Sequence, residues 1–107
     1  MEKTFGQILT DARKEHRLSQ KELAASLKKE DGEAISPQYL NDIEHDRRNP
    51  PSEFILTQIA EILKIDLDVL SYYAGRLPSD AQNAKNVNDE RVIAAYQAFR
   101  RALKGKQ

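Results

Sequence analysis

Apolar residues along the chain recur at intervals of three and four positions, the period of an α-helix that buries one side. The positions that follow this spacing are Phe5, Ile8, Leu9 and Ala12; Leu23, Ala24 and Leu27; Phe54, Ile55, Ile59, Ile62 and Leu63; and Val92, Tyr96, Phe99 and Leu103. No segment alternates apolar and polar residues for long enough to indicate a β-strand. The pattern therefore predicts an all-α fold.

Residues that cap helix ends divide this pattern into five short helices and a sixth at the C-terminus. Thr4 with Gln7, and Ser19 with Glu22, have the spacing of capping boxes. The other expected starts are Ser36 before Pro37, Ser52, Asp66, and Asn88 or Asp89. The expected ends are near His16, at Asn49-Pro50-Pro51, and at Gly75 and Pro78. Residues 28–34 and 79–87 are polar, and we expect them to be loops.

The helix that begins at Pro37 has one narrow apolar side and one polar side. At 100° per residue, one side carries Leu40, Ile43 and Glu44, and the opposite side carries Gln38, Asn41, Asp42 and His45. Amides and carboxylates match base edges, because glutamine pairs with adenine and aspartate accepts from cytosine N4. The polar side is therefore a candidate reader of bases, although any amphipathic surface helix has one. Asp42 has a second interpretation, in which it only pairs with an arginine or caps a helix.

The charges of the chain balance, with 17 Lys and Arg against 17 Asp and Glu, whereas a DNA-binding domain usually has a basic excess. DNA binding would therefore depend on local positive charge, and from Asp80 onward six basic residues stand against three acidic ones. Arg47-Arg48-Asn49 follows the polar helix, where phosphate contacts are expected, although such a pair is also typical of a solvated surface. Gln20 and Lys21 lie at a helix N-terminus, whose backbone N–H groups favour phosphate.

Other kinds of chemistry find no support in the sequence. Without cysteine the chain has neither disulfides nor thiolate metal sites, in keeping with a reducing cytoplasm. His16 and His45 have no acidic or histidine neighbours at the spacing of metal ligands. No catalytic triad, phosphate-binding glycine loop or His-Glu-x-x-His motif is present, and no apolar run approaches the roughly 20 residues that span a bilayer. We expect a cytoplasmic protein that is not an enzyme and has no cofactor, metal or membrane contact.

Three motifs occur in order along the first half of the chain: Leu18-Ser19-Gln20-Lys21-Glu22-Leu23-Ala24, Ile35-Ser36-Pro37-Gln38-Tyr39-Leu40-Asn41-Asp42-Ile43-Glu44, and Arg48-Asn49-Pro50. Together with Ile59-Ala60-Glu61-Ile62-Leu63 and Ala74-Gly75-Arg76-Leu77-Pro78, this order resembles the phage-repressor-type (XRE) helix-turn-helix regulators over about residues 5–78. The resemblance implies a five-helix domain that binds operator DNA as a dimer, with its third helix in the major groove and its second across the backbone.

The resemblance also implies roles for single residues. The base readers would be Gln38 and Asp42, with Pro37 and Asn41 beside them. The phosphate contacts would be Ser36, Gln20, His45 and Asn49, in addition to Lys21, Arg47 and Arg48. Arg13 and Glu44 resemble the buried ion pair of the family, which is structural, because removing one partner leaves a buried charge.

The turn between the second and third helices departs from the family pattern. Residues 28–34 separate Leu27 from Ile35, where the family has a tight turn, and a longer surface loop costs little closure entropy. Lys28 and Lys29 would add phosphate contacts. The acidic residues of the insert, Glu30, Asp31 and Glu33, would be repelled by DNA, so they must point away or the loop serves another partner.

A second departure is Asp46, at a position where the family usually has glycine. Aspartate tolerates the left-handed conformation better than most residues. We therefore expect the turn after the third helix to form in this chain at some cost in strain.

The last helix carries a short seam of apolar residues. Val92, Tyr96, Phe99 and Leu103 are spaced by four, three and four, and they are flanked by Arg91, Arg100, Arg101 and Lys104. The seam either folds back on its own domain or pairs with a second subunit, and the polar connection before it favours pairing. The expected organisation is a DNA-binding domain at 1–78, a connection at 79–87 and a dimerisation helix at 88–107.

Two functions follow from these features. The first is a transcriptional regulator, expected to be a repressor, that binds a palindromic operator in double-stranded DNA as a homodimer. The second is a protein-interaction module, such as an antitoxin-like protein, whose insert and last helix hold a protein partner. The arginine pair, Gln20 and Gln38 favour the first, whereas the insert and the balanced charge favour the second.

Overall fold

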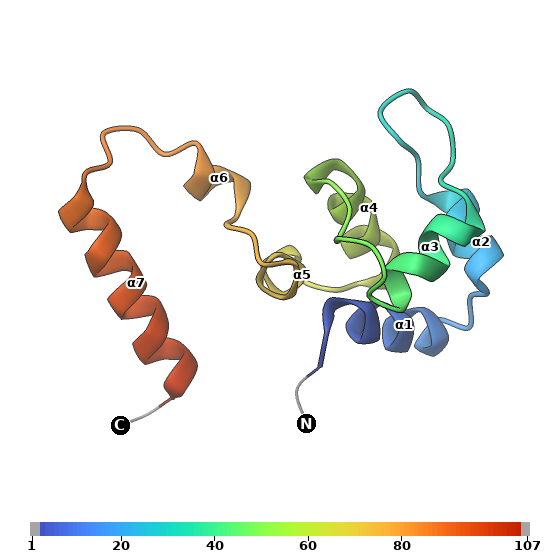
Figure 1. Cartoon of the computed structure of the whole chain (residues 1–107), viewed down its shortest axis with the longest axis horizontal. Helices are drawn as coiled ribbons and strands as arrows, with labels where there is room; N and C mark the ends of the chain where they lie inside the picture. The colour runs from blue at the N-terminus through green and yellow to red at the C-terminus, as the bar shows by residue number, and fades with distance from the viewer. Residues whose placement is uncertain (1–2, 106–107) are drawn as a thin grey trace.

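The computed structural model describes residues 3–105, and the expected bounds at residues 1 and 107 lie outside them. Its helices are α1 (Phe5–Glu15), α2 (Gln20–Ser26), α3 (Pro37–Glu44), α4 (Glu53–Leu63), α5 (Leu67–Ala74), α6 (Ser79–Gln82) and α7 (Asp89–Lys104). Figure 1 shows α1 to α5 packed together, with α7 standing apart at the other end of the molecule. Between residues 3 and 105 the only β-type pairing is one isolated bridge, between Lys28 and Ala34, so the all-α prediction is confirmed.

Most of the helix starts agree with the capping pattern of the sequence. Thr4 and Ser19 form complete capping boxes, and Ser36, Asp66 and Asn88 each accept a hydrogen bond from a backbone N–H of the first turn. Ser52 occupies the N-cap position of α4 but makes no side-chain capping bond. Helix starts were therefore predictable because a cap is a local interaction between residues close in sequence.

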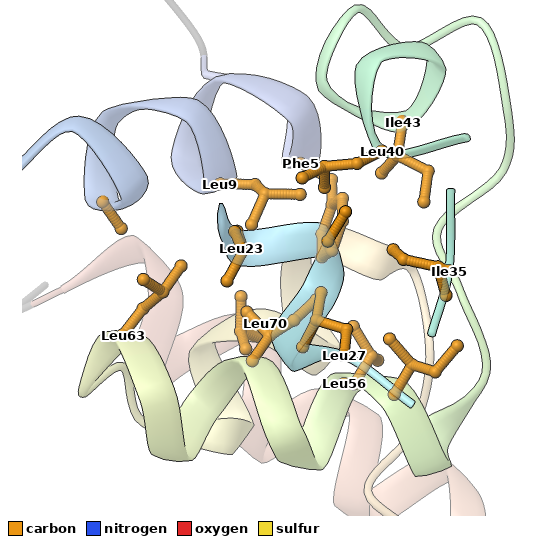
Figure 2. Close-up of a cluster of buried hydrophobic side chains, with 14 residues drawn as sticks. Phe5, Leu9, Leu23, Leu27, Ile35, Leu40, Ile43, Leu56, Leu63 and Leu70 are labelled. Atoms are coloured by element: carbon orange, nitrogen blue, oxygen red, sulfur yellow. The ribbon is translucent and has the colours of Figure 1, made fainter. Parts of the chain in front are cut away.

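One core joins the first five helices. Its members are Phe5, Leu9, Ala12, Leu23, Ala24, Leu27, Ile35, Leu40, Ile43, Ile55, Leu56, Ile59, Leu63 and Leu70. Figure 2 shows these side chains converging from α1, α2 and α3 onto α4 and α5. Because α3 buries only Leu40 and Ile43 among its apolar residues, its other side is left for contacts outside the core.

A close approach between α1 and the end of α3 depends on Gly6. A Cβ atom at this position would lie well inside van der Waals contact of the Glu44 carbonyl oxygen and 2.8 Å from Asp46 Oδ1. The Gly6 N–H donates to Asp46 Oδ1 at 3.0 Å, and Thr4 Oγ1 donates to Asp46 Oδ2 at 2.6 Å. Asp46 has a φ of +59°, so its carboxylate ties the left-handed turn after α3 to the start of α1.

The insert between α2 and α3 is an ordered hairpin and not an irregular loop. Lys29 N–H donates to the Glu33 carbonyl and Gly32 N–H to the Lys29 carbonyl, both at 2.8 Å, with Gly32 at a φ of +89°. This is a turn closed by a glycine in the left-handed region, a common hairpin connection. Figure 1 shows the hairpin projecting from the α2–α3 corner, away from α7.

A single side chain of α4 holds the base of the hairpin. The Gln58 amide accepts from Lys28 N–H and donates to the Lys28 carbonyl, both at 2.8 Å. Leu27 and Ile35, on either side of the hairpin, are buried and joined by a backbone hydrogen bond of 2.9 Å. The insert therefore leaves the packing of α2 on α3 intact.

The connection after α5 differs from the expected loop, because residues 79–82 form the single turn α6. Pro78 precedes the turn, Asp80 lies in its first turn, where the helix dipole favours an acidic residue, and Gln82 Nε2 donates to the Leu77 carbonyl at 2.6 Å. The expectation of a loop over 79–87 was wrong for these four residues. Hydrogen bonds between neighbouring residues account for this turn, since α6 buries none of its residues.

No residue of α7 is buried. The side chains of its apolar seam, Val92, Tyr96, Phe99 and Leu103, are 41%, 44%, 47% and 55% exposed. Phe99 approaches Tyr72 of α5 with ring centroids 6.2 Å apart, and a gap of about 350 Å³ lies between the two helices. The seam therefore faces its own domain without being covered by it.

Candidate nucleic-acid interface

The polar side of α3 is the candidate DNA-reading surface, since its opposite side is held by α1 and α2. Pro37, Gln38 and His45 are exposed there, and Asn41 and Asp42 are half-buried. His45 Nδ1 lies 2.9 Å from the Asn41 carbonyl oxygen. The base readers expected from the sequence thus share one side of one helix.

A buried ion pair fixes α3 to α1. Arg13 Nε donates to Glu44 Oε2 at 2.6 Å and Arg13 Nη2 to Glu44 Oε1 at 3.1 Å, with the two side chains only 10% and 1% exposed. Arg13 Nη1 also donates to the Leu18 carbonyl at 2.7 Å. A bidentate ion pair of this kind fixes both the position and the orientation of the two side chains. It holds the C-terminal end of α3 at a defined distance from α1.

Hydrogen bonds lead from this ion pair toward the surface. Gln20 Nε2 donates to Glu44 Oε1 at 2.8 Å, and Asn41 Nδ2 donates to Gln20 Oε1 at 3.2 Å. The family resemblance predicted that Gln20 contacts phosphate. In the structure its side chain is half-buried, and both its amide nitrogen and its amide oxygen make hydrogen bonds within the protein. Within the structure it links α2 to α3.

The outer end of this chain of contacts is a cluster around Asp42. Arg47 Nη2 donates to Asn41 Oδ1 at 2.7 Å, and Arg47 Nε and Nη2 lie 3.3 and 3.2 Å from Asp42 Oδ1. Gln38 Nε2 donates to the same Asp42 oxygen at 2.9 Å. The alternative interpretation of Asp42, pairing with an arginine, therefore matches the geometry without DNA.

Arg48 has different surroundings from its neighbour. Its guanidinium carbon lies 5.3 Å from the centre of the Tyr39 ring, and no carboxylate within residues 3–105 pairs with it. Stacking on an aromatic ring leaves the N–H donors of arginine available at its edge. Three other expected phosphate contacts, Lys21, Ser36 and Asn49, are exposed.

The segment that follows Arg48 is anchored by Arg76, two residues after the end of α5. Arg76 donates through Nη2 to the Pro50 carbonyl at 2.9 Å and through Nη1 to the Pro51 carbonyl. Proline has no backbone N–H, so only the carbonyl oxygens of Pro50 and Pro51 can make backbone hydrogen bonds. Arg76 donates to both of them. These two bonds hold the segment that follows Arg47 and Arg48 against the residues at the end of α5.

In the part of the chain that the structure describes, no three His, Asp or Glu side chains are grouped as metal ligands. Among the helices between residues 3 and 105, none combines the length and apolar content of a bilayer span.

Comparison with known proteins defines the class. The helix-turn-helix family model matches residues 9–70, more than half of the chain. The protein therefore belongs to the XRE-type helix-turn-helix family of DNA-binding transcription regulators, which are not enzymes.

A solved structure named as the SinR protein–SinI protein complex contains a chain similar to this one. The two chains share 24% identical residues, and the match covers 91% of this chain and 97% of that chain with a TM-score of 0.52. At this identity the similarity shows the fold alone. No curated protein matches the chain.

Three of the contacts that position the site were not predicted from the sequence. They are the Asp46 carboxylate on the start of α1, the Gln58 clamp on the hairpin, and the stacking of Arg48 on Tyr39. The first two join residues about 30 to 40 positions apart, and no local spacing rule reports such pairs. Arg48 and Tyr39 are nine positions apart, across a helix end where helical periodicity no longer applies.

Proposed function

We propose that this protein is a repressor that occupies a palindromic operator as a homodimer, with α3 in the major groove and no chemistry of its own. The observation that carries the proposal is Arg48, an exposed cation without an acidic partner in the described residues, held against Tyr39 of α3. A cation stacked on Tyr39 at this place suits a phosphate next to the groove that α3 would enter.

The proposed roles follow the position of each side chain. Gln38, Asn41 and Asp42, with Pro37, would meet base edges, because they lie on the side of α3 that the core leaves open. Lys21, Ser36, His45, Arg48 and Asn49 would meet the backbone, whereas Arg47 is already held by Asn41 and Asp42. Gln20 would meet the backbone only through its remaining N–H, since its oxygen accepts from Asn41. The DNA-binding unit would span 1–78, with 79–87 as connection and 88–107 for dimerisation.

Selection of bound duplexes from a random pool tests the reading helix. We expect the wild type at near-physiological salt to recover an inverted repeat, because two copies related by a two-fold axis read two half-sites. Gln38→Ala should relax the preference at one symmetric position by about tenfold, the size of one good side-chain contact to a base.

Gln97→Ala is the matched control, since Gln97 is an exposed glutamine of α7 remote from α3. It should recover the wild-type motif unchanged. Recovery of no motif by the wild type, or an equal effect of both substitutions, would contradict a base-reading role for α3.

Dimerisation is tested by the mass of the protein in solution. Phe99→Asp places a carboxylate in the exposed seam of α7, where a second copy would otherwise cover apolar side chains. We expect light scattering coupled to gel filtration to give a dimer for the wild type and a monomer for this variant.

Gln97→Asp adds the same charge to α7 about 140° around the helix from the seam, and should stay dimeric. A wild type that is a monomer at tens of micromolar would contradict the proposed dimer. In that case the uncovered seam favours the second function, binding of a protein partner. The similar chain from a solved protein–protein complex points the same way.

A further inference from the structure

The two adjacent arginines after α3 differ in whether a carboxylate pairs with them. Arg47 lies within 3.2 Å of the Asp42 carboxylate and also donates to Asn41 at 2.7 Å, whereas Arg48 has only the Tyr39 ring. A guanidinium paired with a carboxylate attracts a phosphate less strongly than an unpaired one, because the nearby negative charge offsets part of its field. The equal roles that the sequence suggests for the two residues therefore do not follow from their surroundings.

The Asp42 carboxylate uses one oxygen for every contact. Gln38 Nε2 and both contacting nitrogens of Arg47 reach Oδ1, and no donor of the described residues reaches Oδ2. The Asp42 side chain is 21% exposed, so Oδ2 remains an acceptor at the surface of α3. The Gln38 amide is fixed as well, because only its NH₂ group can point at a carboxylate, and its Oε1 is left as a second acceptor.

An aspartate on a DNA-reading helix needs such a partner. A carboxylate without a counter-charge is repelled by the phosphates on both sides of the groove, and this repulsion opposes the gain from a hydrogen bond to a base. With Arg47 attached, the pair carries no net charge while Oδ2 still accepts. The pairing therefore allows α3 to approach DNA. The consequence is that Arg47 does not contact a phosphate itself.

We propose that Arg47 is a positioning residue, the counter-ion that allows Asp42 to accept a hydrogen bond from an exocyclic amino group in the major groove. The amino groups available there are cytosine N4 and adenine N6, whereas guanine O6 and thymine O4 are acceptors that a carboxylate disfavours. Arg48 is then the phosphate contact of the pair. The inference rests on the proposed function and assigns the selectivity of that same surface.

A double-mutant cycle on DNA affinity separates the two roles of Arg47. The variants are Arg47→Ala, Asp42→Asn, the combination of both, and Arg48→Ala as the neighbouring control, each titrated on one fixed duplex at several salt concentrations. If Arg47 is a counter-ion, Arg47→Ala weakens binding about tenfold when Asp42 is present, but less than about twofold in the Asp42→Asn background.

The salt dependence of DNA affinity is a second measurement, which a purely structural role of a residue would leave unchanged. Loss of one phosphate contact lowers the slope of log affinity against log salt by about one unit. We expect this decrease for Arg48→Ala, and we expect the combined Arg47→Ala, Asp42→Asn protein to keep the wild-type slope. Duplex selection should also show Asp42→Asn losing the preference for cytosine or adenine at one symmetric position.

An equal cost of Arg47→Ala in both backgrounds, with a slope decrease of about one, would make Arg47 a phosphate contact and overturn the inference. A preference for guanine or thymine at the position that Asp42→Asn affects would overturn the assigned base chemistry. A wild type that selects no motif at all would contradict the proposed function, and the affinity cycle on the fixed duplex would still decide the role of Arg47.

Discussion

Replacing Gly6 by alanine is expected to lower the free energy of unfolding by about 3 kcal/mol, near the upper end of what overpacking a tight contact costs. The added methyl group would meet the Glu44 carbonyl, a backbone atom that moves only if the end of α3 moves with it. The displacement would also weaken the hydrogen bond from Gly6 N–H to Asp46. In a chain of this size the melting temperature should fall by more than about 10 °C, which calorimetry measures directly.

Gly32→Ala is the informative comparison. No atom lies within 4 Å of a Cβ at Gly32, but its φ of +89° disfavours any side chain, so the expected loss is only about 1 kcal/mol. Similar losses for the two substitutions would show that backbone freedom, and not the approach of α1 to α3, explains the glycine at position 6. Of these two substitutions, only Gly6→Ala should lower DNA affinity, because Gly6 lies against the end of α3 and Gly32 does not.

Removal of the Arg13 side chain should cost about 3–5 kcal/mol in urea unfolding, the range found when one partner of a buried ion pair is deleted. Arg13→Ala would leave the Glu44 carboxylate, 1% exposed, without its counter-charge. It would also disturb Gln20 and, through Gln20, Asn41 on the reading side of α3. We therefore expect weaker DNA binding although Arg13 itself is buried beneath the surface that would meet DNA.

Two further proteins make this prediction specific. Lys14→Ala, at the exposed neighbouring position, should change stability by less than about 0.5 kcal/mol. The combined replacement Arg13→Met, Glu44→Leu should recover much of the lost stability, because an apolar pair leaves no buried charge. It should not recover DNA affinity, since Gln20 would still lack the Glu44 oxygen to which it donates. A combined variant as unstable as Arg13→Ala would show that packing, and not the unpaired charge, causes the loss.

Elements that depend on neighbouring residues were predictable from the sequence. The capping boxes at Thr4 and Ser19 and the proline after Ser36 are local signals, and each marks a helix start in the structure. The polar and apolar sides of α3 also follow from periodicity, because helix geometry fixes the side on which each residue lies. The family followed from the order of these signals along the chain.

Features that join distant residues, or that depend on side-chain competition, were not predictable in this way. The insert at residues 28–34 is an ordered hairpin because Gln58 of α4, 30 positions after Lys28, binds both of that residue's backbone groups. The cost of the non-glycine turn at Asp46 is offset by hydrogen bonds to Thr4 and Gly6, some 40 positions earlier. Neither partner leaves a signal at a fixed spacing.

The sequence by itself therefore determined the helices other than α6, the side of α3 that stays polar and the class of protein, because all three rest on residues three or four positions apart or on motif order. Only the tertiary structure decided which charged side chains are paired within the protein. Arg47 and Arg48 are equivalent neighbours in the sequence. In the structure, Arg47 contacts a carboxylate on α3 and Arg48 an aromatic ring. The physical reason is that the direction of a long side chain after a helix end is chosen by competing partners in space, and these partners exist only once the chain has folded.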